Sequence, residues 1–198
     1  RSAQRYRNAW TRWRSSLREP LLYRMVELAN VTCRLYQNNE LASAYTLTRS
    51  TLEASAMLYW LQIKIHTTVK AGHVDKELDN LLMRALLGRK DRDVSLNPMN
   101  VQTYIDHMDK QFQGMGQMYD NLSEYAHPNW FGVMSLYGKP PWERRCLNLG
   151  WPEKGTRLGE GLPLLCGALQ IFKYSYQKIS DDFSKFIRVC DQDILRQA

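Results

Sequence analysis

The sequence lacks the features that mark several specialised protein classes. Its 198 residues include 4 cysteines and no C-x-x-C pair, which excludes a dense disulfide framework and disfavours a zinc site. The 11 glycines and 7 prolines are too few for a collagen-like or low-complexity chain. The longest apolar runs, Ala56–Leu61 and Leu162–Leu169, are far shorter than the roughly 20 residues of a membrane span. We therefore expect no transmembrane segment.

Catalytic signatures are equally scarce. There is no glycine-rich phosphate loop and no G-x-S-x-G nucleophile motif. Glu124 and His127 form an E-x-x-H pair, but a di-iron bundle needs a second such pair and two further glutamates, which are absent from the sequence. The sequence therefore predicts neither a metal site nor a cofactor.

The cysteines are widely separated along the chain. Cys33, Cys166 and Cys190 lie in apolar helical patterns, where cysteine behaves as a small buried hydrophobic residue. Because no dense disulfide framework is indicated, the sequence favours a reducing, cytoplasmic setting.

Positive charge is concentrated at the beginning of the chain. The net charge is +7, and the first 18 residues carry six arginines and no acid: Arg1, Arg5, Arg7, Arg12, Arg14 and Arg18. The other 180 residues therefore carry about +1. Three interpretations of this Arg1–Arg18 arm are open. It binds nucleic-acid phosphates while Trp10 and Trp13 stack on bases, it lies on an anionic membrane surface, or both tryptophans pack on the protein and the arginines face water.

Apolar residues recur with helical spacing through most of the chain, which predicts an all-α fold. The predicted helices cover residues 2–17, Pro20 to about Tyr36, 40–67, 75–87 and 100–126, with a long final helix from Pro163. Gly72 marks a turn, and His127-Pro128 ends the fifth helix because proline disfavours helix in the residue before it. The helix over 40–67 is apolar nearly all round, as expected for the buried centre of a bundle.

Residues 128–161 differ in composition from the helical segments because they are rich in proline, glycine and tryptophan. Within them, Val133–Tyr137 and Arg145–Leu149 can pair as a small hairpin around Gly138-Lys139. Such a long irregular segment inside a compact domain is usually functional or carries its own structure. The sequence therefore predicts one domain over 1–198, a bundle of about six helices with this insertion before the long C-terminal helix.

The last turns of the predicted fifth helix carry the densest group of polar residues. Asp120, Ser123, Glu124 and His127 follow i, i+3, i+4, i+7 spacing and so share one edge of that helix. His127 can act as a general acid or base held by a neighbouring carboxylate. Alternatively, it caps the helix and pairs with Glu124 to orient the following loop.

Arg49 and Glu53 are charged residues on the otherwise apolar central helix. Charges in such a position are seldom buried without partners. They either form a structural ion-pair network, or Arg49 projects into a pocket and holds a phosphate or carboxylate. We predict that Arg49 and His127 belong to one cluster bridged by Glu53 or Glu124, because each has an acid one turn away.

Two stretches together resemble a known family. Arg49-Ser-Thr-Leu-Glu53 and Leu122-Ser-Glu-Tyr-Ala-His-Pro-Asn129 resemble a bacterial helical family of unknown function that is similar to the HEPN superfamily. The resemblance implies a helical, dimeric domain, and many HEPN domains are metal-independent ribonucleases of toxin or phage-defence systems. Their motif pairs a histidine, matched by His127, with an arginine shortly before it. Asp120, Asn121 and Leu122 occupy the positions of that arginine, and Arg49 is the candidate to replace it.

The resemblance implies specific roles. His127, Arg49 and Glu124 would be catalytic, and the substrate-binding residues would be Glu53, Ser123, Tyr125 and Asn129. The expected partners are a second copy of the chain, in a homodimer, and RNA or a nucleotide. The alternative hypothesis is a non-catalytic dimerisation or protein-interaction module in which this polar cluster is structural.

Overall fold

The computed structural model describes the backbone of residues 2–75, 77–88, 97–139, 148–152 and 158–196. Side chains are described over the same ranges except at 2–16, 79, 86–87, 158–160 and 194–196. In chain order the described elements are α1 (Ser2–Gln37), α2 (Leu41–Ala71), α3 (Leu78–Leu87), α4 (Val101–Asp109), α5 (Met115–Ala126), the π-helix η1 (Trp130–Met134), α6 (Ser135–Tyr137), β1 (Gly138–Lys139), β2 (Asn148–Leu149) and α7 (Leu158–Arg196). The predicted all-α fold with a small hairpin before a long C-terminal helix is confirmed.

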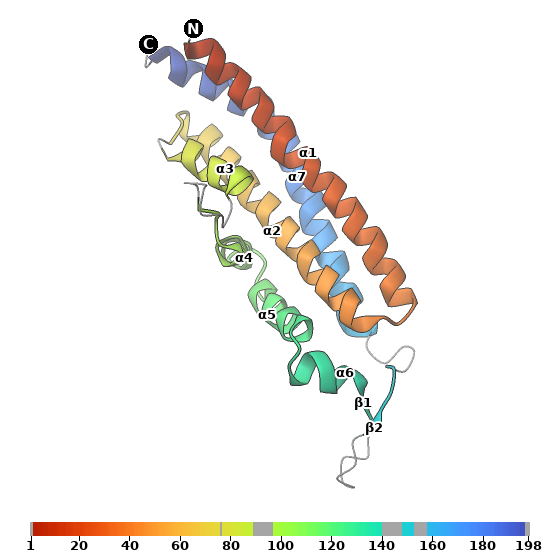
Figure 1. Ribbon diagram of the computed structural model, residues 1–198. Helices are drawn as coiled ribbons and strands as arrows, with labels where there is room; N and C mark the ends of the chain where they lie inside the picture. Colours follow the sequence, from red (N-terminus) through yellow and green to blue (C-terminus); the bar gives the residue numbers. More distant parts are fainter. Residues whose placement is uncertain (1, 76, 89–96, 140–147, 153–157, 197–198) are drawn as a thin grey trace.

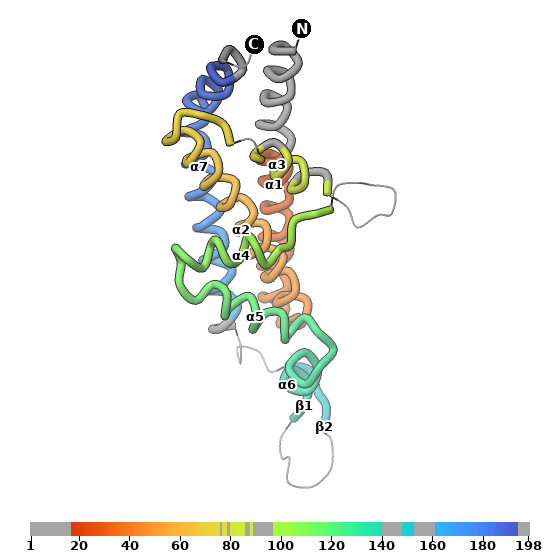
Figure 2. The backbone as a smooth tube through the Cα atoms, turned by 90° about the vertical axis from the view of Figure 1, so that its left-hand side faces the viewer, coloured from red at the N-terminus to blue at the C-terminus, as the bar shows by residue number. Residues whose placement is uncertain are grey.

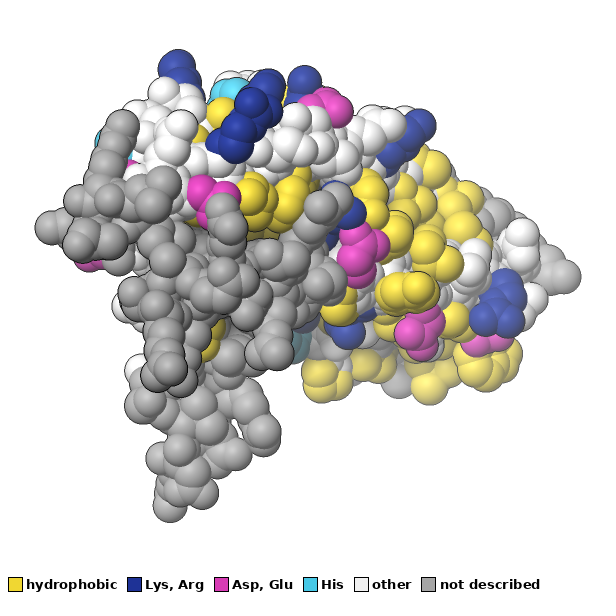
Figure 3. All heavy atoms as spheres, turned by 90° about the horizontal axis from the view of Figure 1, so that it is seen from above, with side chains coloured by type: hydrophobic (Ala, Val, Ile, Leu, Met, Phe, Trp, Pro, Cys, Tyr) yellow, Lys and Arg dark blue, Asp and Glu magenta, His cyan; other side chains and the backbone are white. Residues whose placement is uncertain are grey.

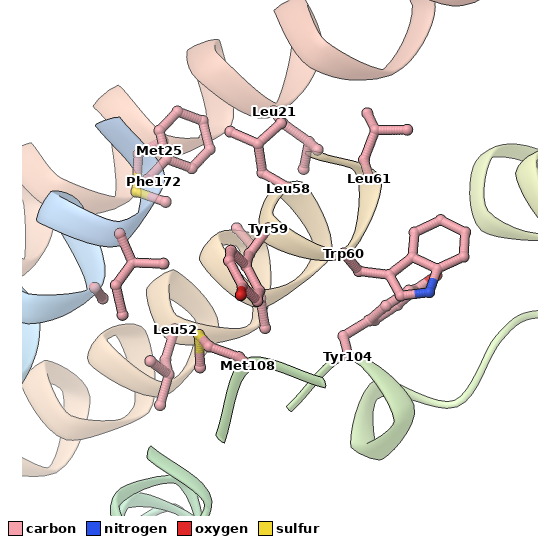
Figure 4. Close-up of a cluster of buried hydrophobic side chains, with 14 of the residues drawn as sticks. Leu21, Met25, Leu52, Leu58, Tyr59, Trp60, Leu61, Tyr104, Met108 and Phe172 are labelled. Carbon is pink, nitrogen blue, oxygen red and sulfur yellow. The ribbon is translucent and has the colours of Figure 1, made fainter. Parts of the chain in front are cut away.

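The helix α2 lies at the centre of the structure (Figure 1). Helices α1 and α7 pack on one side of it, and α4 and α5 pack on the other. Leu58 of α2 lies towards Leu21 of α1, whereas the Trp60 ring meets the Tyr104 ring of α4 (Figure 4). The helix extends to Ala71, beyond the predicted end at 67, and is capped by Gly72, the predicted turn residue, whose φ of 69° glycine adopts at little cost. The predicted central place of this helix, which is apolar on nearly all sides, is thus confirmed.

The start of the second predicted helix at Pro20 is wrong, because α1 is continuous and contains this proline. Leu17 and Leu21, which flank the proline, are both buried against the rest of the bundle. Their packing holds the two segments on one axis although proline removes a backbone hydrogen bond. Likewise, α7 begins at Leu158 and includes Pro163 near its start, rather than beginning there.

The helices α1 and α7 lie against each other along much of their length (Figure 1). Arg18, the last arginine of the predicted arm, donates a hydrogen bond to Ser180 Oγ (3.0 Å) and lies over the Tyr176 ring. The other five arm arginines lie outside the described side chains. Described Lys and Arg side chains stand among acidic and hydrophobic ones in the view from above (Figure 3). None of the described helices is both long and apolar enough to cross a membrane.

Tyr36, near the end of α1, packs against the beginnings of α2 and α7. It is 1% exposed, its hydroxyl shares a 2.8 Å hydrogen bond with Thr48 Oγ1 of α2, and its ring meets Tyr45 edge-on. A Cβ atom added to Gly161 of α7 would lie 2.0 Å from the Tyr36 oxygen. Glycine is therefore required where α7 passes the phenol.

Burial raises the pKa of Tyr36 from 10.0 to about 12. Because the unfolded chain then ionises first, the free energy of unfolding should fall as the pH rises from about 10 to about 12. Denaturant titrations at about pH 9 and about pH 11 will measure this loss. The Tyr36→Phe variant should be less stable by about 1 kcal/mol at neutral pH but lose less stability in base. The exposed Tyr23→Phe control should keep the wild-type pH dependence, and an unchanged dependence in Tyr36→Phe would contradict the assignment.

The single helix predicted over 100–126 is also wrong, because α4 and α5 are separate helices (Figure 2). Gly114, with a φ of 93°, lies immediately before α5. The Asp109 carboxylate accepts a hydrogen bond from the Gly116 N–H (2.9 Å) and so caps the start of α5 from the end of α4. The apolar stripe continues across the break, which is why spacing alone did not reveal it.

The insertion is partly helical. β1 pairs antiparallel with β2, which confirms the predicted hairpin, but Val133–Tyr137 belongs to η1 and α6 rather than to a strand. Of the predicted second strand, residues 148–149 form β2, and residues 145–147 lie outside the described residues. Gly138-Lys139, predicted as the turn, is wrong as a turn because it forms β1 itself. The hairpin is therefore shorter than expected, and the chain between its strands, residues 140–147, lies outside the described residues.

The cysteines only partly follow the prediction of burial. Cys190 is buried at 2% exposure, whereas Cys33 and Cys166 are exposed. Both exposed cysteines lie on long helices, one on α1 and one on α7, and an apolar pattern did not distinguish the inner from the outer face at their positions. Cys146 lies outside the described residues.

Candidate functional site

Most of the candidate residues lie where α2 and α5 pack along each other (Figure 2). We call this the α2/α5 seam; its side chains are Ala42, Thr46, Arg49 and Glu53 from α2, with Tyr119, Ser123, Ala126 and His127 from the end of α5. The α2 residues, and Tyr119, Ser123 and Ala126 of α5, are spaced by three or four positions, which places each set on one face of its helix, and His127 follows directly as the cap of α5. The two helices run antiparallel here, because Tyr119 contacts Arg49 whereas Tyr125 stacks on Tyr45.

Arg49, Glu53 and Tyr119 form a compact cluster at one end of the seam. Arg49 Nη2 donates to the Tyr119 hydroxyl (2.8 Å), which in turn donates to Glu53 Oε1 (3.2 Å). Arg49 Nε lies 3.3 Å from the same carboxylate oxygen, and the guanidinium carbon lies 5.0 Å from the Tyr119 ring centre. About a quarter of each charged side chain is exposed, so the ion pair is neither fully buried nor fully solvated. The Arg49 charge is therefore already compensated within the fold.

His127 lies at the other end of the seam, beside a groove of about 480 Å³. Side chains from α2 (Ala42, Ser43, Thr46 and Leu47) and from the end of α5 and η1 (Tyr125, Ala126, His127, Pro128 and Val133) line this groove, together with Gly132. His127 caps α5: its backbone is extended, and its N–H donates to the Ser123 carbonyl (3.2 Å). The imidazole is exposed, so a ligand in the groove can reach it.

The turn after His127 is held by two residues. Asn129 Nδ2 donates to Glu124 Oε2 (2.6 Å), and Asn129 Oδ1 accepts from the Gly132 N–H (3.0 Å). A Cβ atom on Gly132 would lie 1.9 Å from the His127 carbonyl oxygen, so only glycine fits. We call residues 127–132 the His127 corner. Its contacts assign Asn129 and Glu124 a structural role in orienting it.

The structure groups the predicted site residues in pairs. Arg49 contacts Glu53, and Glu124 contacts Asn129, but none of the described acidic side chains connects Arg49 with His127. Arg49 follows Thr46, which lines the groove, by about 4.5 Å along the α2 axis. The placement on one seam agrees with the sequence hypothesis, but its acid bridge is not among the described contacts, and the common site stays a prediction.

Three further residue assignments follow from the contacts. The Ser123 hydroxyl donates to the Tyr119 carbonyl (2.8 Å), so it is engaged within α5. Tyr125 stacks on Tyr45 with ring centres 4.5 Å apart and also lines the groove. Asp120 is exposed and makes none of the described bonds to the cluster.

Sequence reasoning missed Tyr119 and Gly132. Tyr119 belongs to an apolar stripe that predicts only core packing, and nothing in the spacing indicates that its hydroxyl meets Arg49 across 70 residues. Gly132 lies in an insertion with many glycines, so the sequence did not indicate that this particular position requires glycine. The only local signal was the Asn129–Gly132 spacing, which fits an Asx-type turn.

No metal site is apparent among the described residues, because no three His, Cys, Asp or Glu side chains converge. Comparison with models of protein families, with curated proteins and with solved structures found no match for this chain. The resemblance to the HEPN superfamily therefore remains a hypothesis that depends on the two sequence stretches.

Proposed function

We propose that this chain is a HEPN-like helical domain that binds RNA along the α2/α5 seam. One observation carries the proposal: Arg49 and the exposed His127 occupy the same seam, and the described residues that line the groove beside His127 include no acid. The RNA phosphate would bind at the Arg49 end of the seam, while the sugar and base would lie in the groove beside His127. The net charge of +7 favours association of the whole chain with a polyanion mainly through the six arginines of the Arg1–Arg18 arm, because the other 180 residues carry only about +1.

The chemistry proposed for this seam is metal-independent RNA cleavage. His127 would remove the proton of a ribose 2′-hydroxyl or protonate the leaving oxygen. Arg49 would stabilise negative charge on the phosphate with its Nη1 donors, which have no hydrogen bond to a described residue. Glu53 and Tyr119 would hold the guanidinium in place while this happens.

RNA cleavage in the presence of a chelator tests the proposal. We expect cleavage of single-stranded RNA to continue in EDTA and to fall by about 10²–10⁴-fold in His127→Ala, because a general acid or base contributes that much. Thermal unfolding should change little, since this imidazole is exposed. His73→Ala is the matched control, because His73 is also exposed but follows the opposite end of α2. Equal cleavage by the wild type and His127→Ala would contradict the role of His127.

The second candidate is a non-catalytic dimerisation or protein-interaction module. The closed Arg49–Glu53–Tyr119 cluster favours it, because an arginine already paired with a carboxylate and a phenol serves stability without any ligand. Absence of cleavage and of binding across varied RNAs would decide for this module.

A further inference from the structure

We infer that Trp130 and Phe131 form a base-stacking platform that directs single-stranded RNA into the groove beside His127. The inference rests on the proposed RNA-binding function and adds the substrate class. These two aromatic side chains open η1 and are 59% and 49% exposed. Two adjacent exposed aromatic side chains give an apolar surface of the kind that interaction sites use.

The platform is connected to the core through a series of aromatic contacts. Phe131 meets Tyr125 edge-on, with ring centres 6.1 Å apart and planes at 81°. Tyr125 stacks on Tyr45, which meets the fully buried Tyr36 edge-on at 6.1 Å. Because Tyr125 also lines the groove, the exposed ring of Phe131 and the wall of the groove share one residue.

The His127 corner fixes the platform relative to the groove. Asn129 bonds both Glu124 on α5 and the N–H of Gly132, and Val133 N–H donates to the Asn129 carbonyl (2.9 Å). Gly132 is buried against the His127 carbonyl. The backbone of Trp130 and Phe131 is therefore preorganised beside His127, which lowers the entropic cost of binding.

The chemistry of the neighbourhood favours nucleic acid over a purely apolar partner. The groove beside the His127 corner is lined by His127 and by three residues that carry a hydroxyl group, Ser43, Thr46 and Tyr125. Such side chains suit sugars and phosphates, which need hydrogen-bonding partners. Aromatic faces bind bases only when the bases are unpaired, because a duplex keeps them stacked inside. The platform should therefore select single strands over duplexes.

Binding of a short 2′-O-methyl oligouridylate, measured by fluorescence anisotropy, tests the platform without cleavage, because this RNA lacks the attacking hydroxyl. We expect each of Trp130→Ala and Phe131→Ala to weaken binding about tenfold, the effect of losing one stacked base. Trp130→Phe should retain most of the affinity, and the duplex with oligoadenylate should bind more weakly than the single strand. Tyr23→Ala is the matched control, because Tyr23 is 78% exposed on α1 but remote in sequence from the corner.

Each outcome is decisive. If the wild type binds the oligonucleotide and both alanine variants, with unchanged melting temperatures, bind equally well, the platform is overturned and the rings belong to an apolar protein surface. Equal binding of single strand and duplex also overturns it. If the wild type binds no RNA at all, the proposed function fails together with the platform.

Discussion

Gly132→Ala is expected to destabilise the protein by about 3 kcal/mol and to abolish RNA binding at the seam. The added methyl group would lie 1.9 Å from the His127 carbonyl oxygen and 2.9 Å from the Tyr125 carbonyl oxygen. Both contacts are with backbone, which cannot move aside as a flexible side chain can. The His127 corner would have to open, and His127 would separate from Trp130 and Phe131. Urea titration and the anisotropy assay measure the two effects.

Gly167→Ala provides the matched control. A Cβ atom at this position of α7 meets no atom within 4 Å, and alanine is the better helix former by up to about 1 kcal/mol. This variant should therefore be as stable as the wild type or more stable, with unchanged RNA binding. A Gly132→Ala protein as stable as Gly167→Ala would show that the corner can shift and would contradict its rigidity.

Trp60→Ala is expected to lower the free energy of unfolding by about 3–5 kcal/mol, the usual cost of removing a large buried aromatic side chain. Trp60 is 1% exposed in the centre of α2, and its ring meets Tyr104 at 5.4 Å between ring centres (Figure 4). The substitution would leave a cavity between α2 and α4. Chemical denaturation followed by circular dichroism gives the change directly.

Trp151→Ala is the control for this change, because it removes the same side chain from a position that is 80% exposed. Its stability should stay within about 0.5 kcal/mol of the wild type. If the two variants lost equal stability, the assignment of Trp60 to the centre of the core would be wrong.

The candidate site could be predicted only in part. Glu53 and Arg49 are four residues apart on one helix, so the sequence sufficed to pair them. The contact of Tyr119 with both depends on how α5 packs against α2, and no local rule reports that packing. For the same reason the acid expected between Arg49 and His127 was not found among the described contacts.

Local rules therefore determined much of the fold from the sequence alone. The apolar periodicity of α2 predicts its central place, and Gly72 predicts the turn that follows this helix. Pro128 predicts the end of α5. Each of these effects acts within a few residues of the chain. Tertiary structure decided the rest. Burial of Leu17 and Leu21 kept α1 continuous through Pro20, although proline alone predicts a helix start there. The Asp109 cap divided α4 from α5, and close backbone approach made Gly132 indispensable. These outcomes depend on contacts between packed segments, whose energies exceed the weak local preferences that a sequence displays.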